Sequence, residues 1–180
     1  MLHRVHKPMS HLARGSRLPR HLHADGYATL VLEGGYEEAG EGGRWRVGPG
    51  QVLLHGPFSV HRNQSLEHGA RLVNLPLRSK TDVSTCGTVA DADLVARLAE
   101  RDPLAAAEAL VEGWRGDVPP LDDAPDRLRK VLSGPGAVRI QNWAEAHGVA
   151  RQTVFRGFRA LYGLRRRATG SKRGRVARGA

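Results

Sequence analysis

The 180 residues are enough for one large domain or two small ones, and a hydrophobic fraction of 40% predicts a packed core and excludes wholesale disorder. No apolar run reaches the roughly 18 residues of a membrane-spanning helix, no signal-peptide core follows the basic N-terminus, and the single cysteine, Cys86, excludes an internal disulfide, so we expect a cytoplasmic protein. The net charge of +10 lies entirely in residues 151–180, which contain nine Arg, one Lys and no acidic residue.

Residues 1–17 are basic and show no periodic pattern of apolar side chains, so we expect an extended or poorly ordered lead-in. From residue 18 to residue 80, short β-rich runs alternate with turns that contain Gly or Pro. The predicted strands are residues 27–32, 44–47, 51–55, 60–63 and 71–77. Short strands at this spacing predict an antiparallel β-barrel or sandwich.

Histidine, glycine and proline recur in this block at spacings that belong to a known pattern. The residues concerned are His21-x-His23, Gly34, Gly48-Pro49-Gly50, and Pro57 followed by His61 and Asn63. The pattern resembles that of the cupin β-barrel, and the resemblance implies that His21, His23 and His61 converge on a metal inside the barrel. The alternation agrees with this, because residues i and i+2 of a strand point to the same face. Three imidazoles from two strands suit Zn, Fe, Ni or Cu.

The cupin pattern also implies a glutamate about four residues after the second histidine, and here Gly26-Tyr27-Ala28 offers no carboxylate. Two interpretations stay open. In one, His21, His23 and His61 bind a divalent transition metal, with His55 as an additional ligand. In the other, the same histidines and Tyr27 line a pocket for a small ligand and hold no metal. Because no base or nucleophile accompanies the histidines, we expect neither an enzyme nor a required cofactor.

The middle of the chain predicts helices. Residues 88–117 form a helical connector, in which Asp91 precedes a run of good helix formers. Asp102-Pro103 places an N-cap before a proline at the first helical position and opens a helix over residues 104–114. Residues 118–125 are a linker by composition.

The stretch 137–163 predicts two short helices that meet at a tight turn at Gly148. The first helix carries Ile140, Trp143, Ala144 and His147 at helical spacing. The second has an apolar face and a polar face, which consist of Val154, Phe158 and Leu161 and of Gln152, Arg156 and Arg159. A helix of this kind docks one side on its scaffold and presents the other to the major groove of DNA.

This stretch resembles the first helix-turn-helix unit of AraC-type transcriptional regulators, through Trp143-Ala144, Gly148-Val149, Arg156, Phe158 and Gly163. In that family a small hydroxyl residue caps the recognition helix. Here Ala150 takes its place, which weakens the cap by roughly 1 kcal/mol. The family's second helix-turn-helix unit has no counterpart after Gly163, so the resemblance implies a regulator truncated after its first unit.

The resemblance assigns roles to the polar residues of the second helix. Gln152 and Arg156 are the predicted base readers, whereas Arg151 and Arg159 contact phosphates and Thr153 reaches either. Farther along, Arg165, Arg166 and Arg167 are expected to bind the DNA backbone without reading sequence, and such binding weakens as salt rises.

Together these patterns predict an α+β protein in which a cupin-like antiparallel β-barrel precedes an all-α helix-turn-helix region. The expected divisions are a lead-in at 1–17, a sensor barrel at 18–80, a connector at 88–117, a linker at 118–125, a helix-turn-helix domain at 126–164 and a disordered basic tail at 165–180. The predicted function is a sequence-specific DNA-binding regulator whose barrel senses a small molecule or mediates dimerisation, and we expect a homodimer with no membrane partner. The alternative is a cupin-type metal-binding protein or enzyme with a non-functional DNA-binding region.

Overall fold

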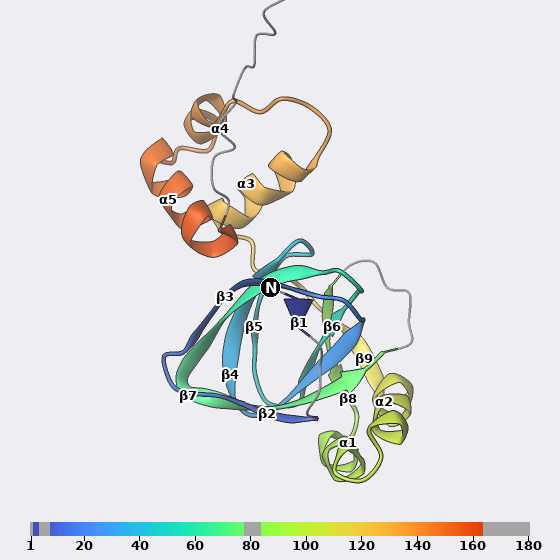
Figure 1. Ribbon diagram of the computed structural model, residues 1–180. Coiled ribbons are helices and arrows are strands. Elements are labelled where there is room, and N and C mark those ends of the chain that lie inside the picture. Colours follow the sequence, from blue (N-terminus) through green and yellow to red (C-terminus); the bar gives the residue numbers. More distant parts are fainter. Residues whose placement is uncertain (1, 4–7, 78–83, 164–180) are drawn as a thin grey trace, which may run out of the picture.

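The structure is a computed structural model and describes residues 2–3, 8–77 and 84–163. A nine-stranded sheet curls into a barrel, with two helices at one end and three helices at the other (Figure 1). The strands are β1 (Leu2–His3), β2 (Met9–Leu12), β3 (Arg17–His23), β4 (Tyr27–Gly40), β5 (Arg44–Val47), β6 (Gln51–His55), β7 (Val60–Pro76), β8 (Thr85–Val89) and β9 (Trp114–Val118).

Two long strands, β4 and β7, organise the sheet. They pair antiparallel along most of their length, from Tyr27 opposite Pro76 to Gly40 opposite His61. The strand order is β1-β3-β7-β4-β6-β8-β9, while β2 pairs with β7 and β5 pairs with β4. Every pair is antiparallel except β1 with β3. The predicted antiparallel β structure is therefore confirmed.

The sheet extends on both sides of the predicted range 18–80. Strand β2 lies inside the predicted lead-in 1–17, where Met9 pairs with Val73. Strands β8 and β9 add to the sheet after residue 80. The edge of β7 pairs with β2, β6 pairs with β8, and β8 pairs with β9, and this long-range pairing is a tertiary effect that a local pattern does not reveal.

Apolar side chains fill the barrel in two clusters. One of them contains Tyr36, Trp45, Leu53 and Cys86, all buried. Cys86 is thus the small core residue that its isolation in the sequence suggests. The other cluster lies between the sheet and two helices, α1 (Ala92–Ala99) and α2 (Pro103–Glu112).

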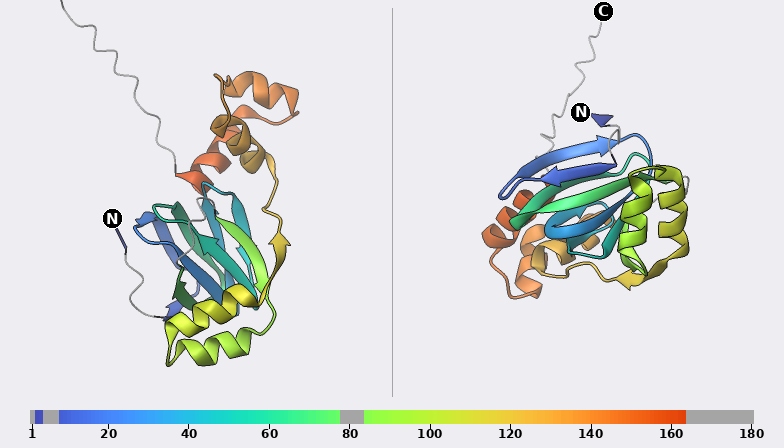
Figure 2. Two further views of the ribbon diagram at one scale, coloured as in Figure 1. Left: turned by 90° about the vertical axis from the view of Figure 1, so that its right-hand side faces the viewer. Right: turned by 90° about the horizontal axis from the view of Figure 1, so that it is seen from below.

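Helices α1 and α2 form a hairpin that covers one end of the barrel (Figure 2). The side chain of Asp91 accepts the backbone N–H of Leu94, and the side chain of Asp102 accepts two backbone N–H groups at the start of α2. The predicted helix over 104–114 is too long by two residues. It ends at Glu112 because Gly113 caps it and Trp114 begins β9.

Three helices lie at the other end: α3 (Ala124–Ser133), α4 (Ile140–Ala146) and α5 (Arg151–Tyr162). Helices α4 and α5 occupy the two stretches in which helices were predicted. Their shared core contains Leu128, Trp143, Val154, Phe158 and Tyr162. Tyr162 takes the fully buried position that the spacing assigned to Leu161, which is only partly buried.

Two left-handed glycines shape this region, as the sequence predicted. Gly148 has φ of 62° in the turn between α4 and α5, and Gly163 has φ of 65° where α5 ends. His147 differs from its prediction, because it is exposed rather than on the buried face. It stacks on Trp143 with ring centroids 4.1 Å apart and bonds the Trp143 carbonyl through Nδ1 at 2.8 Å.

A buried ionic cluster joins the three helices to the barrel. The Arg44 guanidinium of β5 donates to Asp126 of α3 at 2.8 and 3.1 Å and also bonds Asp123. The Tyr162 hydroxyl of α5 donates to the same Asp126 carboxylate. Because Asp126 is 1% exposed, its charge is held away from water by partners from both parts of the molecule.

None of the helices in the described ranges is both long and apolar enough to cross a lipid bilayer. The predicted basic tail 165–180, with Arg165, Arg166 and Arg167, lies outside the described residues.

Candidate metal centre

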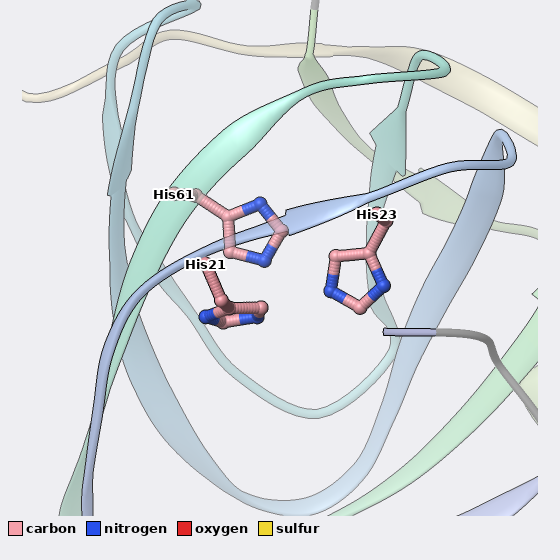
Figure 3. Close-up of side chains that lie close together, drawn as sticks. All are labelled: His21, His23 and His61. Atoms are coloured by element: carbon pink, nitrogen blue, oxygen red, sulfur yellow. The ribbon is translucent and has the colours of Figure 1, made fainter. Parts of the chain in front are cut away.

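Three histidine rings from two paired strands face one another inside the barrel (Figure 3). His21 and His23 lie on β3, and His61 lies on β7, directly opposite His21 in the register. One ring nitrogen from each histidine lies within 4.8 Å of the other two. The ring centroids of His21 and His61 are 4.5 Å apart, and those of His21 and His23 are 4.9 Å apart. A metal ion at their centre would be held from three sides.

Local backbone features place these rings. The register between β3 and β7 shifts between Leu18 and His21, and such irregularities re-aim side chains near functional sites. On the opposite side, Gly40 faces His61 across β4 and β7. A Cβ at Gly40 would lie 3.1 Å from the His61 Cβ, so glycine leaves the space that the His61 side chain occupies.

A buried carboxylate lies on the far side of His61. Glu38 of β4, His55 of β6 and His61 form a second group whose ligand atoms also lie within 4.8 Å of one another. His55 Nε2 is hydrogen-bonded to Glu38 Oε1 at 2.8 Å, and His61 Nδ1 lies 3.8 Å from the same oxygen. The Asn63 amide, oriented to satisfy its neighbours, donates to Glu38 Oε2 at 3.0 Å. Glu38 is 1% exposed, so these partners stand in for water.

Tyr27 connects the two groups. Its hydroxyl lies 3.1 Å from His61 Nε2, and its ring stacks on His55 with centroids 4.1 Å apart. Tyr27 also pairs with His55 in the register of β4 and β6. His61 therefore has a phenol at one ring nitrogen and a carboxylate beyond the other.

Burial sets the protonation states of the cluster. It lowers the pKa of His55 to about 3, and it lowers the pKa of His61 to about 3 although the Glu38 carboxylate opposes this. Burial also raises the pKa of Glu38 to about 7, against the opposing effect of His61 and His21. At neutral pH the two imidazoles are uncharged and the carboxyl group is poised to gain or lose a proton.

Uncharged imidazoles are the form that binds metal ions. The Nδ1 atom of His61 is buried and has no hydrogen-bond partner among the described residues, which is costly unless something else occupies it. His21 and His23 are half-buried, whereas His55, His61 and Glu38 are fully buried, so the cluster is reached from the side of β3. The donor set fits a divalent transition metal.

The turn beside this approach is strained. Phe58 has φ of 59°, a value that non-glycine residues rarely adopt, and its side chain is 66% exposed. The turn is held by the backbone of β3, because the Phe58 N–H donates to the His23 carbonyl at 2.9 Å. Strain of this kind often accompanies functional sites, and here it adjoins the histidine cluster.

All five residues that the sequence placed in the barrel pocket lie together: His21, His23, Tyr27, His55 and His61. The sequence pattern did not indicate Glu38, because it places the glutamate a few residues after His23, whereas Glu38 lies farther along the chain on β4. One signal existed in the sequence: Tyr36, Glu38 and Gly40 alternate along one strand, so Glu38 shares a face with an aromatic residue.

The polar residues predicted to read DNA all lie on α5, and Gln152, Arg156 and Arg159 share the face opposite its buried side chains. They are Arg151, Gln152, Thr153, Arg156 and Arg159, and all of them are exposed. Val154, Phe158 and Tyr162 are buried on the other side, so the two faces of the helix are separated as predicted. The Ala150 side chain offers no cap to the start of α5. Contact with DNA stays a prediction.

Solved structures with a similar barrel are cupin-fold proteins. KdgF from Halomonas sp. has 22% identity and a TM-score of 0.35, over 39% of this chain and 69% of that one. Salicylate 1,2-dioxygenase from Pseudaminobacter salicylatoxidans has 19% identity and a TM-score of 0.35, over 46% of this chain and 25% of that one. A deletion mutant of the Bacillus subtilis oxalate decarboxylase OxdC has 14% identity and a TM-score of 0.35, over 82% of this chain and 29% of that one.

These similarities concern the fold alone, and the chain spans less than a third of the dioxygenase and decarboxylase chains. No protein-family profile and no curated protein matches the sequence. None of the neighbours named above is a DNA-binding regulator by its title.

The prediction that the protein is not an enzyme is corrected. Proteins titled as a dioxygenase and a decarboxylase are among the structures found to be similar. The exclusion also rested on the lack of a base near the histidines, and Glu38 lies 2.8 Å from His55 and 3.8 Å from His61.

Proposed function

We propose that this chain is a cupin-like metal-binding protein whose barrel holds a divalent transition metal at His21, His23 and His61. The observation that carries the proposal is the convergence of three ring nitrogens within 4.8 Å, from two strands in direct register. Zn, Fe, Ni and Cu all accept imidazole ligands in such a set. Three protein ligands leave a coordination position for water or a substrate, which is the arrangement of catalytic rather than structural sites.

Glu38 and His55 support the site from behind. A carboxylate beyond a metal-binding histidine fixes the orientation of its ring and raises its basicity. Glu38 can also hold a proton near neutral pH, because burial raises its pKa to about 7. A bound ion would act as a Lewis acid on a molecule in its open position, and Glu38, beyond His61, would hold or release a proton through that histidine.

Metal titration of the purified protein tests the proposal. We expect one Zn²⁺ or Co²⁺ ion per chain by calorimetry and elemental analysis. His61→Ala and His21→Ala should each lower the affinity by at least about tenfold, the usual scale for losing part of a metal site. His68→Ala is the matched control, because His68 is exposed on β7 and outside both clusters. Equal binding by the wild type and the His61→Ala variant would contradict the proposal.

A second candidate function is nucleic-acid contact by α5. It is favoured by the exposed Arg and Gln face, which includes Gln152, Arg156 and Arg159 around a surface hollow on α5. Arg and Gln side chains are standard partners of base edges and phosphates. The buried Val154 and Phe158 hold the helix from behind and leave that face free.

Duplex binding at several salt concentrations tests this second function. We expect affinity to fall as salt rises, and Gln152→Ala or Arg156→Ala to reduce the preference among duplexes of different sequence by about 1–3 kcal/mol per lost base contact. Arg97→Ala on α1, at the far end of the barrel, is the control. If every duplex binds equally and neither α5 variant changes this, sequence reading by α5 is ruled out.

A further inference from the structure

A crevice of about 220 Å³ lies where the three C-terminal helices meet the barrel. We call it the joint crevice. It is lined by Arg20 of β3, Gly40 and Glu41 at the end of β4, Arg129, Leu132 and Ser133 of α3, and Phe158 and Tyr162 of α5. None of these residues belongs to the histidine cluster, so the joint crevice is separate from the proposed metal centre.

Two arginines line the joint crevice, and each donates one hydrogen bond between the barrel and the C-terminal helices. Arg20 donates from Nη1 to the Tyr162 carbonyl at 3.0 Å, and Arg129 donates from Nη1 to the Glu41 carbonyl at 2.6 Å. The Nε of Arg129 is buried and has no hydrogen-bond partner among the described residues. A buried donor without a partner is costly, so this position favours an acceptor from outside the chain.

Positive charge exceeds negative charge in the joint crevice. Glu41 is the only carboxylate among the lining residues, and its nearest oxygen lies 3.7 Å from Arg20 Nη2. The Glu41 side chain is 69% exposed, so water weakens its effect on either guanidinium. The nearby Asp126 carboxylate is bound by Tyr162 and by Arg44, which also pairs with Glu37 and Asp123. Among the lining residues themselves, one guanidinium charge is left for an anion.

The rest of the lining is apolar and aromatic. Phe158 and Tyr162 are almost fully buried, with ring centroids 5.3 Å apart, and Leu132 adds an aliphatic wall. The volume is below the roughly 300–1,000 Å³ of pockets for drug-sized ligands, so the crevice suits a smaller molecule. Guanidinium groups recognise planar carboxylates through paired hydrogen bonds.

We propose that the joint crevice binds a small organic carboxylate, with Arg20 and Arg129 holding the carboxylate and the Phe158 and Tyr162 rings contacting the apolar part. Such a ligand touches the barrel and two of the C-terminal helices at once. Its binding therefore strengthens the docking of α3 and α5 on β3 and β4 by mass action.

Binding of benzoate, measured by calorimetry and by ¹⁵N chemical shifts, tests the proposal. We expect benzoate to shift the amides of Leu132, Ser133 and Phe158, and benzamide, its uncharged isostere, to bind at least about tenfold more weakly. Inorganic phosphate should bind more weakly than benzoate, because it gains nothing from the aromatic lining. Equal binding of benzoate and benzamide, or of benzoate and phosphate, would overturn the assigned ligand class.

Two variants with opposite expected effects locate the site. Arg129→Gln should weaken benzoate binding by at least about tenfold, whereas Arg97→Gln, an exposed arginine of α1, should leave it unchanged. Glu41→Gln should tighten binding, because it removes the opposing charge from an exposed side chain and preserves the backbone carbonyl that Arg129 uses. An affinity that does not rise in Glu41→Gln would contradict the proposal even if Arg129→Gln failed to fold. The benzoate affinities of Arg129→Gln and Glu41→Gln do not depend on the proposed metal centre, so the outcome of the His61→Ala experiment affects neither of them.

Discussion

At the scale of single residues, Glu38 and the histidines near it shift their pKa values in ways that oppose one another. His55 and His61 have pKa values of about 3 in the folded protein, below the usual 6.5. Between these two pH values, the unfolded chain therefore binds two more protons at these histidines than the folded chain does. Their contribution to stability is lost as the pH falls. Glu38 has a pKa of about 7, above its usual 4.5, so the fold binds one more proton between pH 4.5 and 7. Its contribution grows as the pH falls and offsets one histidine.

The change Glu38→Gln tests this balance. In the wild type, the free energy of unfolding should fall as the pH falls from 6.5 to 4.5, because the two histidine contributions outweigh the opposing one of Glu38. In Glu38→Gln both histidine contributions act without an offset, so the slope should become about twice as steep. Urea unfolding of both proteins at three pH values measures the difference, in which the effects of other carboxylates cancel. Parallel slopes would show that Glu38 has an ordinary pKa.

At the scale of elements, α5 is well capped at its C-terminal end and poorly capped at its N-terminal end. Gly163 closes it in the left-handed conformation, whereas Ala150 gives its first N–H groups no acceptor. The Ala150 backbone is nevertheless extended, with φ of −67° and ψ of 122°, as an N-cap residue requires. The side chain, and not the backbone, limits the start of this helix.

The change Ala150→Ser should therefore stabilise α5. A serine hydroxyl can accept the N–H of Gln152 or Thr153, which contributes about 0.5–2 kcal/mol in known N-caps. We expect slower amide hydrogen exchange at the first turn of α5. Ala160→Ser changes an exposed residue away from the ends of the same helix, so it should not slow hydrogen exchange at the first turn. Exchange at the first turn that is as fast as in the parent protein would show that the start of α5 is held by other contacts.

At the scale of the whole molecule, the barrel and the three C-terminal helices depend on Arg44. Its guanidinium lies 3.3 Å from Glu37 of the barrel and 2.8 Å from the Asp126 carboxylate of α3. Because Arg44 and Asp126 are both buried, the loss of either one leaves the other charge without its partner. The same guanidinium keeps the pKa of Asp126 below its usual value although burial opposes this. Arg44 thus pairs with a buried charge that links the barrel to the C-terminal helices.

Removing Arg44 should destabilise the C-terminal helices more than the barrel. In Arg44→Ala the Asp126 charge stays buried without its partner, so we expect a loss of about 3–5 kcal/mol in the free energy of unfolding. The loss should be concentrated in the helices, seen as earlier melting of α3–α5 by hydrogen exchange. Arg71→Ala, which breaks an exposed pair with Glu33, should cost less than about 1 kcal/mol. Similar losses in the two variants would refute the role of Arg44.

The sequence alone determined the local features of this protein. Strand alternation placed His21 and His23 on one face, Asp102-Pro103 started α2, and the spacing of Val154 and Phe158 set the buried side of α5. These features depend on residues within a few positions of one another, where the 2-residue and 3.6-residue periods act.

Only the tertiary structure decided which residues from distant parts of the sequence lie side by side. Glu38 contacts His55 although 17 positions separate them and His55 pairs with Tyr27 at the other end of β4, and Arg20 reaches Tyr162 across 142 positions. Neither contact has a local signature, since the sheet register and the docking of helices arise from long-range pairing and burial. For the same reason, the missing carboxylate near the histidines, and with it the expectation that the protein is not an enzyme, could be corrected only in three dimensions.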